Sequence, residues 1–186
     1  MKNNFLITLL ICAVFFISPS CKKKNVSPLS KLPAATQTGA NTFGCLINGA
    51  AFTPHRRFFL NSDVQANYIY YNGEYYLTIA ASNDSDDKNL ISVDLGTTKL
   101  PIIEGQTLNL ARYNITGEAF GRLAYIPTLG NINEYTTTSV SSGQLHITKF
   151  DQNRQIISAT FSFDALNSSG ETAHITDGRF DMKYTQ

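Results

Sequence analysis

The side chains best suited to bind a ligand are tyrosines around the dipeptide Asn72-Gly73, namely Tyr68, Tyr70, Tyr71, Tyr75 and Tyr76. A tyrosine ring offers a large rigid face and a hydroxyl, which can stack on a sugar or anchor a protein partner. Asn-Gly favours the positive φ angles of a type I′ turn, so the cluster is predicted to span a β-hairpin. These five tyrosines are therefore the candidate binding residues, with cross-strand pairing that only stabilises the hairpin as the alternative.

Catalytic and metal-binding patterns are weaker. The sequence has no Gly-x-Ser-x-Gly, phosphate-binding glycine loop or His-Glu-x-x-His motif. A hydrolase would need paired carboxylates, and the scattered acids Asp164, Glu171 and Asp177 are the candidates. Edge-of-sheet acids are usually solvated, so we expect no enzymatic activity, no catalytic residues and no cofactor.

A metal site has two candidate sources. His146 and His174 lie in strand patterns and His55 stands apart, whereas a zinc site needs three or four ligands. The acidic stretch from Asn83 to Asn89 offers calcium-type oxygens but lacks the EF-hand glycine and glutamate, and Lys88 opposes a cation. We therefore expect no metal and interpret the acidic stretch as a solvated loop.

The N-terminal residues have the layout of an export signal. Phe5 to Ile17 is an apolar run after a basic start, too short for a bilayer whose hydrocarbon takes about 20 residues to cross. Ser20-Cys21 after this run resembles a bacterial lipobox, in which the cysteine is lipidated. Ser18 replaces the usual leucine, so ordinary secretion with cleavage near Ser20 and an uncleaved anchor are the alternatives.

Cysteine usage agrees with export and lipidation. Cys12 lies in the leader and Cys21 would carry lipid, which leaves Cys45 alone and excludes an internal disulfide in the mature chain. The apolar surroundings of Cys45 predict a buried, unreactive thiol.

The sequence divides into a signal peptide over 1–20, a lipidated cysteine with a flexible tether over 21–40, and a folded domain over 41–186. The tether is rich in Pro, Ser, Thr and Lys and has no apolar periodicity. A net charge of +1 gives no support for a nucleic-acid partner.

The domain shows the two-residue period of β-strands. Ile157, Ala159, Phe161, Phe163 and Ala165 alternate with polar residues, and other runs repeat the pattern. Asp151 to Arg154 is predicted to connect strands 143–150 and 155–166, and Asp177-Gly178 to form a turn or bulge. The best helical candidate is a short turn over 107–113. We predict an all-β domain, a single antiparallel β-sandwich or open β-barrel of about eight to ten short strands.

Three stretches, residues 32–49, 142–148 and 175–181, together with the start Cys21-Lys22-Lys23, resemble an uncharacterised family of Bacteroidetes lipoproteins with a domain of unknown function. The resemblance implies lipoprotein status and an all-β body, and brings no activity or catalytic residues. Acidic residues after the lipidated cysteine, which direct surface export in such bacteria, are missing.

These observations predict an outer-membrane lipoprotein, anchored by lipid on its periplasmic or cell-surface face, that acts as a non-catalytic binding or accessory module. Its predicted partners are the membrane, through the lipid, and a glycan or an envelope protein. A structural envelope lipoprotein without a small ligand is the first alternative, and a carboxylate-based hydrolase the second.

Overall fold

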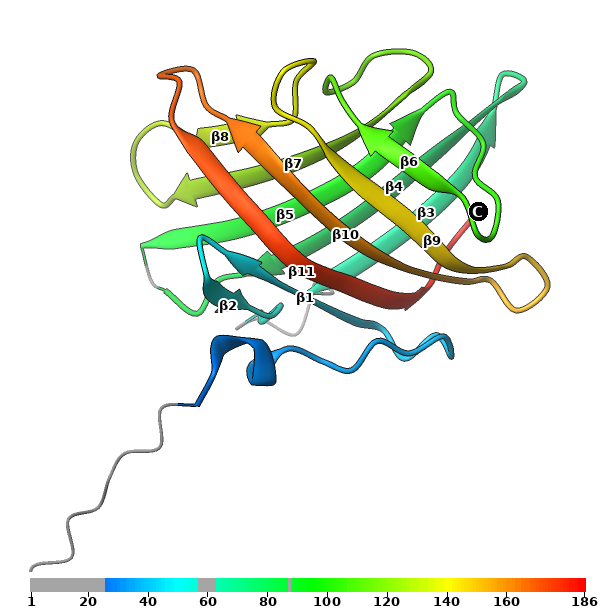
Figure 1. Cartoon of the computed structure of the whole chain (residues 1–186), viewed down its shortest axis with the longest axis horizontal. Helices are drawn as coiled ribbons and strands as arrows, with labels where there is room; N and C mark the ends of the chain where they lie inside the picture. Colours follow the sequence, from blue (N-terminus) through cyan, green and yellow to red (C-terminus); the bar gives the residue numbers. More distant parts are fainter. Residues whose placement is uncertain (1–25, 57–62, 87) are drawn as a thin grey trace, which may run out of the picture.

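A computed structural model describes residues 26–56, 63–86 and 88–186 (Figure 1). The predicted signal peptide and the predicted lipidation residue Cys21 lie outside these ranges. Within them, no helix has the length and apolar character needed to span a membrane.

The described residues form a 3-10 helix, η1 (Pro28–Lys31), and eleven strands, which confirms the predicted all-β class. One more strand is present than the upper prediction of ten. The strands are β1 (Thr42–Ile47), β2 (Ala50–Phe52), β3 (Val64–Tyr71), β4 (Glu74–Asn83), β5 (Asn89–Thr98), β6 (Thr107–Leu110), β7 (Glu118–Pro127), β8 (Asn133–Thr136), β9 (Gly143–Asp151), β10 (Ile156–Leu166) and β11 (Thr172–Lys183).

All the strands belong to one sheet that curls on itself. Its order is β2-β1-β11-β10-β9-β6-β7-β5-β4-β3, and β8 pairs with β10 and β7. The ring closes where the residues after β11 meet β3: the Tyr68 amide donates to the Thr185 carbonyl at 2.8 Å, and the Thr185 amide donates to the Ala66 carbonyl at 3.0 Å. In Figure 1, β9, β10 and β11 cross in front of β3, β4 and β5. The fold is therefore barrel-like.

The alternation seen in the sequence builds the core. Ile157, Ala159, Phe161, Phe163 and Ala165 of β10 all point into the barrel and are buried. Leu77 and Ile79 of β4 meet them from the opposite wall as part of the same apolar cluster. Burial of this kind contributes about 1.5–3 kcal/mol for each large side chain, which is the main force holding the sheet closed.

Turns and bulges follow the local predictions. Asn72 and Gly73 have φ angles of 51° and 83°, as a type I′ hairpin requires. Asp177 has a φ of 52° and lies inside the single strand β11, where the pairing with β10 shifts register, so Asp177-Gly178 is a bulge rather than a turn.

The best helical candidate in the sequence, residues 107–113, is not helical. It begins instead with strand β6 (Thr107–Leu110), whose antiparallel partner is β9. Leu108 and Leu110 are both buried while Thr107 and Asn109 are exposed, a two-residue period that a short window cannot separate from a helical turn. The pairing of β6 with β7 is parallel. The sheet is therefore mixed, whereas the sequence predicts a purely antiparallel one.

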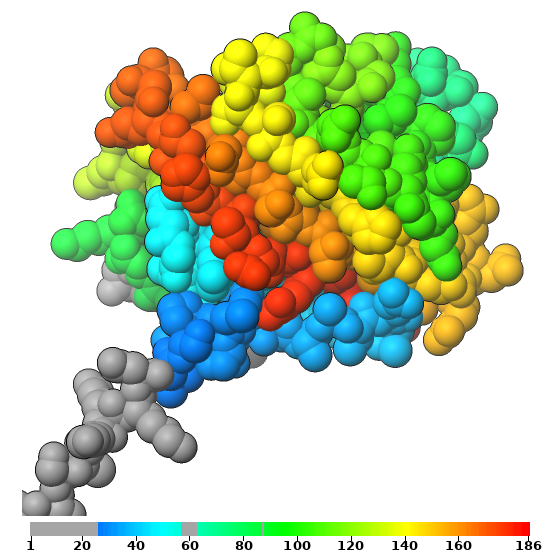
Figure 2. Space-filling view, viewed as in Figure 1, coloured from blue at the N-terminus to red at the C-terminus, as the bar shows by residue number. Residues whose placement is uncertain are grey.

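The second half of the predicted tether lies on the domain. We name residues 32–40 the N-terminal strap; it follows the lower edge of the barrel, against β11, in Figures 1 and 2. Leu32 at its start is buried, and the Arg179 side chain donates to the Pro33 carbonyl at 2.8 Å. At the start of β10, four consecutive residues, Ile156 to Ala159, are buried, so buried and exposed residues do not alternate there. The strap accounts for this because it covers the outer face of the sheet at this point.

The strap is held by one buried carboxylate, that of Asp181 in β11, which is 1% exposed. It accepts hydrogen bonds from the strap amides of Thr38 at 2.9 Å, Gly39 at 2.7 Å and Ala40 at 3.2 Å. The hydroxyls of Thr36 at 2.6 Å, Thr38 at 3.2 Å and Ser158 at 2.8 Å complete the set. Burial alone would raise the pKa of Asp181, but these hydrogen bonds outweigh it and hold the pKa well below its usual range.

We expect Asp181→Asn to lower the free energy of unfolding by about 2–4 kcal/mol, because an amide cannot accept from so many donors at once. The depressed pKa means that the ionised carboxylate stabilises the fold fully above about pH 4, its unfolded pKa, and progressively less as the pH falls below that value. Urea denaturation between pH 7 and pH 2 should therefore show a steeper acid loss in the wild type than in the variant.

The matched control for Asp181→Asn is Asp177→Asn, since Asp177 is exposed and asparagine tolerates its positive φ. A change within about 0.5 kcal/mol is expected there. Equal stability of Asp181→Asn and Asp177→Asn would contradict the structural role of Asp181.

Candidate functional site

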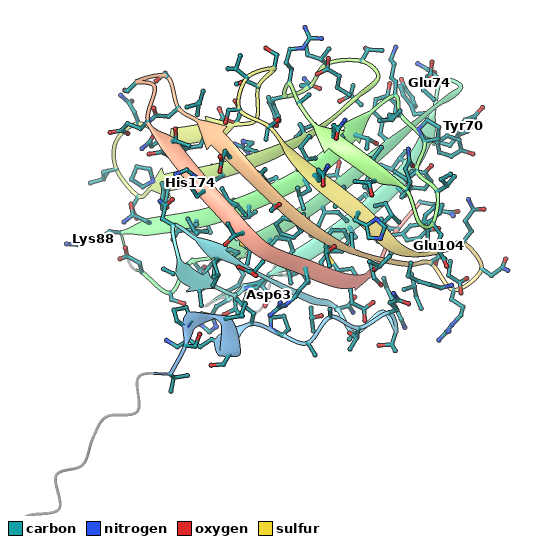
Figure 3. All side chains as sticks on the ribbon, in the orientation of Figure 1. Asp63, Tyr70, Glu74, Lys88, Glu104 and His174 are labelled. Carbon is teal, nitrogen blue, oxygen red and sulfur yellow. The ribbon has the colours of Figure 1, made fainter. Side chains whose placement is uncertain are left out.

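The predicted tyrosine hairpin consists of β3, β4 and the turn that joins them, and its tyrosines differ widely in exposure. Tyr68 is buried, Tyr75 and Tyr76 are half-buried, and Tyr70 and Tyr71 are each 63% exposed. Pairing sets Tyr70 opposite Tyr75 and Tyr71 opposite Glu74. The hairpin therefore has a buried root and an exposed aromatic tip, and Figure 3 shows Tyr70 beside Glu74 at this tip.

Three of the tyrosine rings form a continuous ladder from the core to the surface. The Tyr68 and Tyr75 rings are stacked, with centroids 5.1 Å apart and planes at 8°. The Tyr75 ring then meets the Tyr70 ring at 4.7 Å. Each aromatic pair adds about 0.5–1.5 kcal/mol beyond simple burial, so the exposed Tyr70 ring is supported by rigid neighbours.

The root of this ladder is fixed from several elements. The Tyr68 ring contacts Phe150 of β9 edge-on at 5.1 Å and Tyr184, just after β11, at 6.0 Å. The Tyr68 hydroxyl accepts a hydrogen bond from the Ile102 amide at 3.3 Å, which attaches the loop between β5 and β6. Burial raises the pKa of Tyr68, so its hydroxyl keeps its proton at neutral pH.

A cavity of about 280 Å³ opens beside the ladder, and we call it the tyrosine pocket. Among the described residues, no charged side chain lines it. Its lining residues are Tyr68, Ile69, Tyr70, Tyr75, Gln152 and Gln186. The combination of aromatic rings with two side-chain amides gives both an apolar surface and donors and acceptors, as small-molecule sites require.

Next to the tyrosine pocket lies Tyr184. The Tyr184 hydroxyl is buried, and within the described residues it makes no hydrogen bond of normal geometry. Burial raises the pKa of Tyr184, while the side chain of Gln186 is near enough to act in the opposite direction. Gln186 is thus the side chain that connects the Tyr184 hydroxyl to the tyrosine pocket.

Sequence reasoning identified the tyrosines but missed Gln152, Gln186, Phe150 and Tyr184. Gln152 lies in the turn between β9 and β10, and Gln186 follows β11. No local signal marks these residues, because they reach the hairpin only through closure of the barrel between β3 and Thr185.

A second hollow lies on the outer face of β9, β10 and β11. It has a volume of about 380 Å³ and is bordered by Ala35 of the strap, with His146, Asp177 and Arg179 among its lining residues. Two of its polar groups are engaged: the Arg179 Nε bonds the Pro33 carbonyl at 2.8 Å, and His146 Nδ1 lies 2.9 Å from the Thr107 hydroxyl. This hollow is therefore a weaker candidate than the tyrosine pocket.

Of the other candidate groups, His174 and Asp164 form a pair. His174 Nδ1 lies 2.7 Å from the Asp164 carboxylate, and both side chains are more than half exposed. Glu171 accepts from Asn167 at 2.7 Å, and Asp177 lines the outer hollow. Across the described ranges, no group of three or more His, Cys, Asp or Glu side chains could hold a metal ion.

The described residues of the acidic stretch connect β4 to β5, and oxygens of Asn83 and Asp86 accept hydrogen bonds from within the stretch. The Asn83 side-chain oxygen Oδ1 accepts from the Ser85 amide at 2.9 Å, and the Asp86 carboxylate accepts from the Lys88 amide at 3.0 Å and from the Asn89 side-chain amide at 2.8 Å. Asp87 lies outside the described residues. These bonds agree with the interpretation of a solvated loop.

Cys45 is fully buried in β1, and burial raises the pKa of its thiol to about 12. A thiol with that pKa carries almost no thiolate at neutral pH, so it is unreactive, as predicted.

The fold and the site together define a barrel-like all-β domain with an aromatic pocket at one end. A family model described as a domain of unknown function, DUF6252, matches residues 55–182. The chain therefore belongs to this family. The match spans the tyrosine hairpin and Asp181 but ends before Tyr184 and begins after the strap. No curated protein and no solved structure matches the chain.

We expect the tyrosines to separate into structural and surface residues. Tyr68→Ala should lower the free energy of unfolding by about 3–5 kcal/mol, because it removes a buried ring and the acceptor of the Ile102 amide. Tyr71→Ala should change it by less than about 1 kcal/mol, since that ring is exposed. Thermal and urea unfolding of both variants would test this, and comparable losses would contradict the division.

Proposed function

We propose that this protein is a lipid-anchored, non-catalytic binding module of the bacterial outer membrane, attached through Cys21 and binding an envelope ligand at its tyrosine tip. The observation that carries the proposal is the exposure of Tyr70 and Tyr71 on a hairpin whose root is rigidly packed. Rigid tyrosines lose little conformational entropy on binding, which is why such residues are enriched at interfaces.

Ile69 adds an apolar side chain to the same tip, where it is 45% exposed. Neighbouring exposed apolar groups are costly to keep in water, and monomeric proteins usually reserve such surfaces for binding. The tip therefore fits a partner better than it fits a purely structural role.

The arrangement of the molecule suits an anchored binder. The described N-terminal end, at Pro28–Lys31, lies at the lower left of Figure 1, and the β3–β4 hairpin lies at the upper right. The strap bonded to Asp181 fixes this relation. An anchor that precedes η1 would hold the domain with the tyrosine tip directed away from the membrane.

Lipidation at Cys21 can be tested directly. In a bacterial host that processes lipoproteins, growth with an alkyne-tagged palmitate should label the wild type and the control Cys45→Ala. Cys21→Ser should lose the label and leave the membrane fraction, because no thiol remains at the processing site. Persistent labelling of Cys21→Ser would exclude Cys21 as the anchor.

Binding at the tyrosine tip can be tested by photocrosslinking in intact cells. Tyr71→p-benzoylphenylalanine keeps an aromatic side chain at the tip and should give discrete crosslinked products. The control is Leu129→p-benzoylphenylalanine, since Leu129 is 90% exposed. Its neighbour Thr128 donates its amide to the Lys88 carbonyl at 2.9 Å, and Lys88 lies on the side of the molecule away from Tyr70 (Figure 3).

Products from position 71 that are missing at position 129 would support the proposal. Equal products at both positions would instead favour the structural envelope role, in which contacts are spread over the surface. No products at position 71 would contradict binding at the tip.

A further inference from the structure

We infer that the ligand of the tyrosine pocket is a neutral sugar ring, stacked on Tyr70 and hydrogen-bonded to the amides of Gln152 and Gln186. This inference rests on the proposed function, because it names the ligand class of the same site.

The first argument is the shape of the aromatic surface. Tyr70 is 63% exposed, yet its ring contacts Tyr75 at 4.7 Å, and Tyr75 stacks on the buried Tyr68. A ring held in this way presents a fixed flat face to solvent. Such a face matches the C–H side of a pyranose, which is flat, apolar and slightly positive against the negative face of the ring.

The second argument is the polar part of the pocket. Gln152 and Gln186 line it from two different elements, and each amide offers two donors and one acceptor oxygen. The hydroxyls of a sugar are both donors and acceptors at closely spaced positions, so they suit paired amides better than a carboxylate or a phosphate would.

The third argument is charge. The six lining side chains carry no ionisable acid or base apart from the tyrosine hydroxyls. Desolvating an ionic ligand here would be uncompensated, because none of the described side chains that line the pocket carries an opposite charge. An acidic sugar or a phosphorylated ligand is therefore disfavoured against a neutral one.

The fourth argument is the size of the cavity. The cavity of about 280 Å³ is at the lower end for small-molecule sites, which fits a single ring at the end or edge of a longer glycan.

The test uses the full-length chain in amine-oxide detergent micelles, which contain no sugar. Isothermal titration and saturation-transfer NMR would be run with three neutral probes, maltotetraose, cellotetraose and mannotetraose, and one acidic probe, tetragalacturonate. We expect at least one neutral probe to bind, with saturation transferred to one ring of the oligosaccharide, and the acidic probe to bind at least about tenfold more weakly.

Matched variants separate stacking from folding. Tyr70→Ala should weaken binding at least about tenfold, Tyr70→Phe should stay within about threefold, and Gln152→Leu should weaken it about fivefold or more. Leu129→Ala should leave binding unchanged. Because Tyr70→Ala removes the ring pair with Tyr75, it should lower the melting temperature by a few degrees at most, and all variants should remain folded at the temperature of the assay. Gln152→Leu and Leu129→Ala should match the wild type, since both side chains are exposed.

Binding that is indifferent to Tyr70→Ala, preference for tetragalacturonate, or no binding of any neutral probe would each overturn the inference. If crosslinking at position 71 still gives discrete products in that case, the proposed binding function stands and only its sugar ligand is excluded. A positive result can be extended with vesicles that carry lipopolysaccharide: binding there distinguishes an envelope glycan from a free one.

Discussion

The Asp181 carboxylate is the point on which the arrangement of this molecule depends. Its two oxygens collect hydrogen bonds from the strap residues Thr36, Thr38, Gly39 and Ala40 and from Ser158 of β10. A buried charge is costly unless donors surround it, and here the donors come from a segment that would otherwise be a loose tail. Together with the burial of Leu32 and the Arg179 bond to the Pro33 carbonyl, this ionised group holds the segment against the barrel.

The strand that contains Asp181 also leads to the residues that close the barrel. β11 holds Asp181 and is followed by Tyr184 and Thr185, which meet β3 and close the ring. Closure places Tyr184 against Tyr68, and Tyr68 supports Tyr75 and, through it, Tyr70. The strap and the tyrosine tip are thus linked through one continuous strand, so the exposed rings are fixed with respect to the point where the strap begins.

Alternation in the sequence was enough to predict the strand class, the β10 core face and the Asn72-Gly73 hairpin, because these depend on neighbouring residues alone. The strap was not predictable in this way. Its composition is that of a linker, and its donors acquire a role only when the distant Asp181 is buried beside them. Residues 107–113 offered too few apolar positions to separate a strand from a helical turn. The pocket amides Gln152 and Gln186 reach Tyr70 only after the ring closes, so no spacing along the chain reveals them.

Stability and binding make different demands on the tyrosine hairpin, and the gradient of exposure along it meets both. At the root, the Tyr68 ring and hydroxyl are fully used by Phe150, Tyr184 and the Ile102 amide. At the tip, Tyr71 adds little to the core, so selection for folding alone would accept a polar residue there. Tyr70 lies between these cases, since its ring packs against Tyr75 with the two planes tilted by 46°, yet the residue is 63% exposed. A ring that is rigid yet open is pre-organised for a flat ligand, and this pre-organisation separates a binding surface from an accidental apolar one.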